Sequence, residues 1–177
     1  MRSLAEARSF EVKAAPKVPG SPDHDAVAAF RAETWELVRR IEGAAETLDR
    51  LEEKIRHMRA ALTRTPGAEP ALFGRVDAAG DALDRLRVRL SGDPVRARMN
   101  EPAAPSIRGR IGNVVSGHWD TRQDPTTTQR RDLEIAREAF AAFRDELAAL
   151  VERLAELERA LEAAGAPWTP GRGVAPG

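Results

Sequence analysis

The sequence predicts an all-α protein, an antiparallel bundle of two long helices and a broken middle helix with an irregular tail at each end. Charged residues make up 32% of its 177 positions and aromatic residues only 5%, which is typical of long amphipathic helices. Apolar residues recur at alternating spacings of three and four over several long stretches, as on the buried face of a helix. Segments rich in proline and glycine separate these stretches and predict the helix ends. We therefore expect one helical domain over residues 25–165, between tails at 1–24 and 166–177.

The N-terminal tail contains four residues that break helices. They are Pro16, Pro19, Gly20 and Pro22. Before them, residues 9–13 (SFEVK) alternate polar and apolar side chains, the pattern of a half-buried strand. A lone strand is not stable without neighbours. This segment is therefore expected to be disordered or to pair with another domain.

The first long helix is predicted to begin at Ser21, which can cap it, with Pro22 in its first turn. Its apolar residues follow a heptad pattern over five repeats, so they should form one buried face. That face consists of Val27, Phe30, Thr34, Leu37, Ile41, Ala44, Leu48, Leu51, Ile55, Met58 and Leu62. The TRTPG motif at 63–67 should end the helix, because proline and glycine follow it directly.

A second helix is predicted from about Pro70 to the SGDP motif at 91–94. Its buried face consists of Leu72, Val76, Ala79, Leu83, Leu86 and Leu90. Residues 93–105 carry three prolines and are expected to form a loop.

A short third helix is predicted from Ser106. Its buried face would consist of Ile107, Ile111 and Val114. Gly109 and Gly112 weaken this helix by about 1 kcal/mol each relative to alanine. They are expected to permit the close approach of a neighbouring helix.

The last helix has the clearest pattern. Asp124 is expected to cap it, with Pro125 in the first turn. Its buried face consists of Leu133, Ala136, Phe140, Phe143, Leu147, Leu150, Leu154, Leu157, Leu161 and Ala164. Gly165 should end the helix, and the tail APWTPGRGVAPG is rich in proline and glycine.

The helix lengths suggest how the helices pack. The first and last are each roughly 55 Å long at 1.5 Å per residue, and the second and third placed end to end would match them. The sequence therefore predicts one long helix up, a broken middle helix down and one long helix up, with the two long buried faces toward each other. A four-helix up-and-down bundle is the alternative.

The stretch VVSGHWDTRQDPTTTQRRD at 114–132 holds Ser116, His118, Asp120 and Asp124 within nine positions. A Ser-His-Asp triad is assembled in space, so local clustering does not indicate one, and the chain has no G-x-S-x-G elbow. The favoured interpretation is a structural corner. Gly117 would end the third helix, Trp119 would pack against apolar residues at the end of the bundle, and His118 would contribute little to stability.

The sequence predicts no catalytic, cofactor-binding or metal site. The chain has no cysteine, which excludes disulfides and zinc–thiolate sites. His24, His57 and His118 lack the Glu-x-x-His motif of di-iron bundles. The carboxylate pairs Glu134/Glu138 and Glu152/Glu156 alternate with arginines, which indicates a solvated ion-pair face rather than a glycosidase pair.

Nucleic acid and membranes are not favoured as partners. Lys+Arg equals Asp+Glu, so the whole chain has no net attraction to polyanions. One region, 85–110, is rich in arginine, and an Arg-rich nucleic-acid-binding module remains an alternative. Aspartates dilute this region and no aromatic side chain interrupts it. No segment predicts a membrane span or a signal peptide, so the location is undetermined, with the cytoplasm as the default.

Three stretches carry a resemblance to a known family. They are RARMNEPAAPSIRGRIGNVVSGHWDTRQDPTTTQRRDLEIAREAF at 96–140, LEAAGAPWTPGR at 161–172 and SFEVKAAPKV at 9–18. The first two resemble the C-terminal helical region of large bacterial sortilin/VPS10-like β-propeller proteins, often labelled glycosyl hydrolases with BNR repeats. The third is similar to the segment that links the β part of those proteins to the helices.

The resemblance implies no catalysis on this chain. The family's enzymatic part is the propeller, whose blades carry S-x-D-x-G-x-T-W boxes, and this sequence has none. We therefore expect a non-catalytic structural or interaction module whose partner is a β-rich or propeller protein, or a second copy bound through the helix faces. The alternative is a fragment or subunit of a glycosyl hydrolase-like enzyme whose propeller is on another chain.

Overall fold

The computed structural model describes residues 8–13, 20–167 and 169, and this part of the chain is all-α, as predicted. Its helices are α1 (His24–Thr63), α2 (Pro70–Ser91), α3 (Pro94–Arg98), α4 (Ile107–His118) and α5 (Thr127–Ala163). No strand occurs among the described residues. The masked positions include most of the predicted C-terminal tail, which therefore lies largely outside the described residues.

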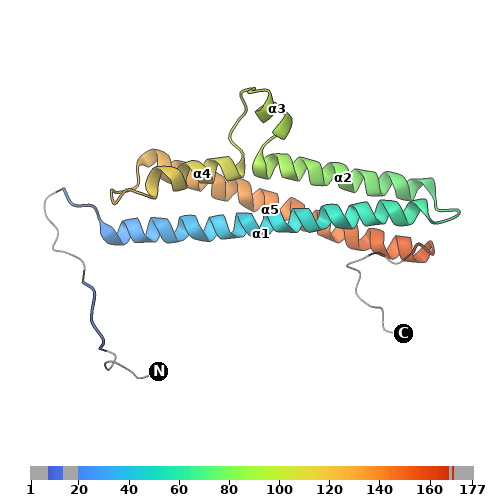
Figure 1. Ribbon diagram of the computed structural model, residues 1–177, viewed down its shortest axis with the longest axis horizontal. Helices are drawn as coiled ribbons and strands as arrows, with labels where there is room; N and C mark the ends of the chain where they lie inside the picture. Colours follow the sequence, from blue (N-terminus) through green and yellow to red (C-terminus); the bar gives the residue numbers. More distant parts are fainter. Residues whose placement is uncertain (1–7, 14–19, 168, 170–177) are drawn as a thin grey trace, which may run out of the picture.

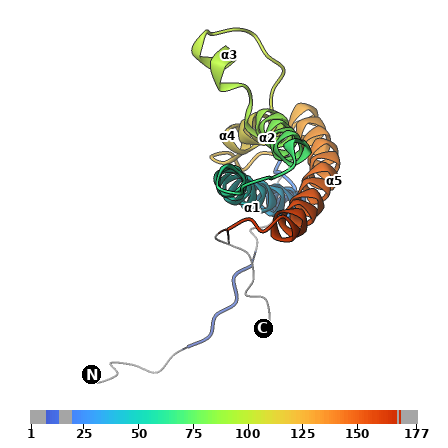
Figure 2. The same cartoon turned by 90° about the vertical axis from the view of Figure 1, so that its right-hand side faces the viewer.

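The helices form the predicted bundle with a broken middle helix. α2 and α4 lie end to end along α1 and α5, and both pack against these two long helices (Figure 1). Viewed along the bundle, α1, α2 and α5 occupy the corners of a triangle (Figure 2). The two long helices do contact each other, but each makes more contact with α2 than with the other. The long faces therefore enclose a shared core rather than facing only each other.

The predicted buried faces are confirmed almost without exception. Every position predicted for α1, α2, α4 and α5 is buried, except Ala164, which is half-buried and is the C-cap of α5 rather than part of it. Burying these side chains removes their apolar surface from water, which is the main driving force for packing the helices. The one addition with chemical interest is His118, which continues the buried face of α4.

Two helix starts differ from the prediction. The N-cap of α1 is Asp23 rather than Ser21, and its carboxylate accepts from the N–H groups of Asp25 and Ala26. The N-cap of α5 is Thr126 rather than Asp124. Thr126 and Gln129 form a capping box in which each side chain bonds to the backbone N–H of the other. Two N–H groups at the start of α5, which have no partner within the helix, are thus satisfied by a reciprocal pair of side chains.

The predicted loop at 93–105 contains a short helix, α3. Asp93 caps it by accepting from the N–H groups of Val95 and Arg96. α3 has no buried residue, and it projects from the bundle at the gap between α2 and α4 (Figures 1 and 2). The loop that interrupts the middle helix, between α2 and α4, therefore contains the short helix α3, which points away from the bundle.

The glycines of α4 do not serve the close helix contact that was expected. A Cβ atom at Gly112 would meet nothing within 4 Å, and one at Gly109 would meet only Ser106 Oγ, its own helix cap, at 3.2 Å. Gly80 in α2 is the closely covered glycine, because a Cβ there would lie 2.5 Å from Arg59 Nη2. Helix packing therefore does not require glycine at position 112.

None of the helices in the described part of the chain is both long and apolar enough to cross a membrane.

Candidate interaction site

The corner between α4 and α5 is built around His118. α4 continues one residue beyond Gly117, so His118 takes the next buried position after Val114. Its side chain is only 3% exposed. The ring lies edge-on to Phe30, with 5.1 Å between centroids, and Nε2 lies 3.1 Å from the carbonyl oxygen of Gln123. His118 is therefore part of the packing, and the expectation that it contributes little to stability is not supported by its environment.

The residues that would make a triad do not converge. Ser116 Oγ donates to the carbonyl oxygen of Asn113 at 3.3 Å, while His118 Nε2 faces Gln123. Asp120 is exposed on the surface. A nucleophile and its base need a mutual hydrogen bond, and these side chains bond to backbone carbonyls instead. Ser116, His118 and Asp120 therefore do not form a triad in this arrangement.

Arg31 of α1 binds the end of α4. Its Nη2 donates to the carbonyl oxygens of His118 at 3.2 Å and Trp119 at 3.3 Å, and also to that of Thr121. Carbonyls at a helix C-terminus have no partner within the helix, and a guanidinium there also interacts favourably with the helix dipole. Arg31 thus fixes the corner against the first long helix.

Trp119 was expected to be buried, and this prediction is wrong. It is 56% exposed. Successive residues in a helix are turned by about 100°, so the residue after a buried His118 is carried away from the core. Trp119 instead meets Trp35 of α1, which is 44% exposed. Their ring centroids are 5.1 Å apart and their planes are inclined by 81°.

The two tryptophans border a groove between α1 and α4 with a volume of about 550 Å³. Apolar side chains from both helices line it, and Gly112 leaves it open. The lining residues are Trp35, Val38, Glu42, Arg108, Ile111, Gly112, Val115, Ser116, Trp119 and Asp120. We call this surface the tryptophan groove.

A second hollow lies under the same tryptophans, next to His118, but it is far smaller. Its volume is about 20 Å³, which is room for about one water molecule. The hollow beside His118 is too small for a substrate, whereas the tryptophan groove has room for a ligand.

The sequence carries one signal for this site. Trp35 directly follows the buried Thr34, so it falls outside the heptad positions of the first helix. A large apolar side chain outside that pattern indicates an exposed aromatic surface. Its partner Trp119 was assigned to the core because the end of α4 was placed one residue too early.

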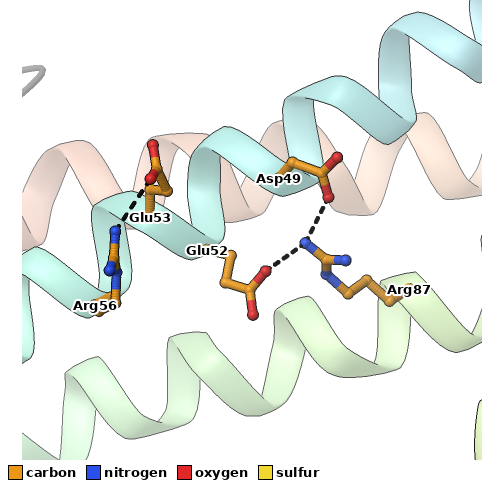
Figure 3. Close-up of polar contacts among 5 residues, drawn as sticks. All are labelled: Asp49, Glu52, Glu53, Arg56 and Arg87. Carbon is orange, nitrogen blue, oxygen red and sulfur yellow. Dashed lines mark hydrogen bonds and ion pairs between the residues drawn. The ribbon is translucent and has the colours of Figure 1, made fainter.

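The arginines of region 85–110 are mostly engaged with carboxylates of the bundle. Arg87 binds both Asp49 and Glu52 of α1, each at 2.7 Å (Figure 3). Further pairs join Arg89 to Glu146, Arg96 to Glu101, Arg108 to Glu42 and Arg110 to Asp132. An arginine held by a carboxylate has part of its charge neutralised and some of its five N–H donors engaged, so it attracts phosphate less strongly. The region is therefore a set of ion pairs, several of which join helices.

Other candidate groups are dispersed. Glu134, Glu138, Glu152 and Glu156 are all exposed on α5. Glu134 pairs with Arg131 at 2.6 Å, as expected of a solvated ion-pair face. Among the described residues, no three His, Asp or Glu side chains come close enough together to hold a metal ion.

The N-terminal segment 8–13 carries no regular secondary structure. Phe10 is 86% and Val12 is 84% exposed. Glu11 and Lys13, two positions apart, form an ion pair of 3.2 Å. In extended chain, residues two apart share a side, so Phe10 and Val12 belong to the opposite, apolar side.

No protein family, curated protein or solved structure that was compared matches this chain.

Proposed function

We propose that this chain is a non-catalytic helical module that attaches to a β-rich partner. The observation that carries the proposal is that Phe10 and Val12 of segment 8–13 are exposed, while Glu11 and Lys13, which alternate with them, form an ion pair. Segments with this alternation add to the open edge of a sheet, with backbone hydrogen bonds giving affinity and alternate side chains giving specificity. The resemblance to the helical region of sortilin-like propeller proteins supports the same kind of partner.

Two features support the non-catalytic part of the proposal. The polar residues of the corner bond to backbone carbonyls, and the hollow beside His118 holds about one water. In this proposal the helical bundle is the part of the complex that is attached to the β-rich partner.

Other partners receive less support. The residues that would mediate self-association through the helix faces are buried within this chain. Arg87, Arg108 and Arg110 are paired with carboxylates, which leaves fewer free cations for a phosphate backbone.

The first step of the test is to look for a neighbouring gene that encodes a propeller with S-x-D-x-G-x-T-W boxes. That propeller is then produced together with this chain, and the proposal expects the two proteins to co-elute in size-exclusion chromatography. Replacing both Phe10 and Val12 by Asp should abolish co-elution, because strand addition places alternate side chains against the partner. Phe73→Asp is the control, since Phe73 is an exposed aromatic on α2. Equal co-elution of all three proteins would contradict strand addition by this segment.

An activity assay distinguishes this proposal from the alternative, in which the chain is a subunit of a glycosyl hydrolase-like enzyme. The module proposal expects no hydrolysis of aryl-glycosides or esters by the purified chain or by its complex beyond that of the propeller alone. Hydrolysis that requires both chains would favour the enzyme-subunit alternative. Turnover by the purified chain that disappears in His118→Ala would overturn the non-catalytic proposal.

A further inference from the structure

The tryptophan groove contains a glycine that helix stability disfavours. Glycine in a helix interior costs about 1 kcal/mol relative to alanine, and Gly112 lies in the middle of α4. No neighbour requires its small size, since a Cβ atom there would meet nothing within 4 Å. What the missing side chain does is keep open the groove that Gly112 lines.

Two tryptophans in mutual contact form part of the groove wall. Trp35 and Trp119 meet edge to face, with planes 81° apart, so their faces form a corner rather than a flat platform. A sugar ring stacks its C–H face on a single open aromatic face, whereas a compact ring that projects from an extended backbone fits into a corner. Proline presents such a ring, and aromatic-lined grooves are the usual receptors of proline-rich segments.

The charged residues at the rim of the groove further restrict which kind of segment can bind there. Arg108 is bound by Glu42 through Nε at 2.9 Å and also through Nη2. Glu36, beside the groove, is likewise bound by Arg40 at 2.8 Å. Among the contacts of the described residues, Asp120 at the Trp119 end has no cationic partner. The groove therefore suits a neutral apolar segment with one basic residue placed at that end.

We propose that the tryptophan groove binds an extended, proline-rich peptide segment of another protein, with a basic side chain of that segment against Asp120. The polyproline conformation is formed before binding and loses little entropy when it docks. Tryptophan is among the residues that contribute most at such contacts. This site lies on α1 and α4, apart from segment 8–13, so it does not depend on the proposed attachment to a β-rich partner.

The test uses the full-length chain and synthetic peptides. The probe is nine prolines followed by arginine, and the control peptide replaces the prolines by alternating glycine and serine. Binding is followed by tryptophan fluorescence in a Trp168→Phe background, in which only Trp35 and Trp119 emit, and by calorimetry. The proline peptide should bind saturably below about 1 mM, and the control peptide should not.

Gly112→Leu is the decisive variant, because its Cβ atom meets nothing within 4 Å, its side chain occupies the groove and leucine favours the helix. It should weaken binding at least about tenfold while circular dichroism and the melting temperature show an intact fold. Gly74→Leu is the matched control, since Gly74 is also an open helical glycine but lies on α2. Asp120→Asn should weaken binding of the arginine peptide severalfold and leave a glutamine-ended peptide unaffected.

Several results would overturn the proposal. One is the absence of saturable binding, and another is equal binding by Gly112→Leu or by the glycine–serine peptide. Binding of cellohexaose that Gly112→Leu abolishes would assign the groove to sugars instead. A concentration-dependent dimer that Gly112→Leu dissociates, measured by sedimentation, would assign it to a second copy of the chain.

Discussion

The backbone N–H of Asp23 donates a hydrogen bond of 3.0 Å to Oδ1 of Asp124, although the two residues are 101 positions apart. Asp23 is the cap of α1, and Asp124 lies in the corner just before α5. The bond therefore joins the starts of the two long helices at one end of the bundle. Asp124 thus connects the two elements, while the capping of α5 belongs to Thr126.

Replacement of Thr126 tests which residue caps α5. Thr126→Ala should lower the free energy of unfolding by about 0.5–2 kcal/mol, the usual cost of a lost cap. Asp124→Ala should cost about 0.5–1.5 kcal/mol, the net contribution of one hydrogen bond. Both are measured by urea denaturation. Asp120→Ala is the control and should change stability by less than about 0.5 kcal/mol, as exposed surface residues do. A larger loss for Asp120 than for Thr126 would contradict this assignment.

His118 should be a stability residue. His118→Ala removes the ring that packs on Phe30 and leaves the Gln123 carbonyl without its partner. This bond is part-buried, so its loss should cost about 0.5–1.5 kcal/mol, the net contribution of one hydrogen bond, and the lost ring adds to that cost. His118→Phe keeps the aromatic packing and should lose less than alanine does. The measurement is thermal unfolding of the three proteins. Equal stability of all three would mean that the corner does not depend on this ring.

Leu150 tests the core between α5 and its neighbours. Its side chain is buried, while that of the next residue, Val151, is exposed. Leu150→Ala should cost about 2–5 kcal/mol, and Val151→Ala less than about 0.5 kcal/mol. Chemical denaturation of both variants measures the difference. A cost below half a kcal/mol at Leu150 would place this face outside the core.

The ion pairs of region 85–110 predict weak binding to nucleic acid. The chain should bind a labelled DNA duplex no more tightly than about 10⁻⁶ M at physiological salt, the range of non-specific contacts. Replacing Asp49 and Glu52 by alanine frees Arg87 from both of its partners (Figure 3) and should strengthen binding. Fluorescence anisotropy measures both proteins. Tight, sequence-dependent binding by the unmodified chain would restore the nucleic-acid alternative.

The sequence by itself determined the helical class, the order of the helices and nearly every buried position. The heptad spacing is a strong signal because each long helix carries its apolar face over many turns, so a single exception has little effect. The sequence determined the ends of the helices less well than their buried faces. Thr126-x-x-Gln129 is a recognisable capping-box pattern, but Asp124 and Pro125 offered a competing start only two residues earlier.

The tertiary structure alone decided how the corner is used. An end of α4 at His118 rather than at Gly117 is a difference of only one residue. Each further residue of a helix, however, turns the next side chain by about 100°. That turn buries His118 and exposes Trp119. The meeting of Trp119 with Trp35 joins residues 84 positions apart, and no local pattern encodes such a contact. The helices follow from spacing along the chain, whereas the tryptophan groove exists only because packing brings α1 and α4 together.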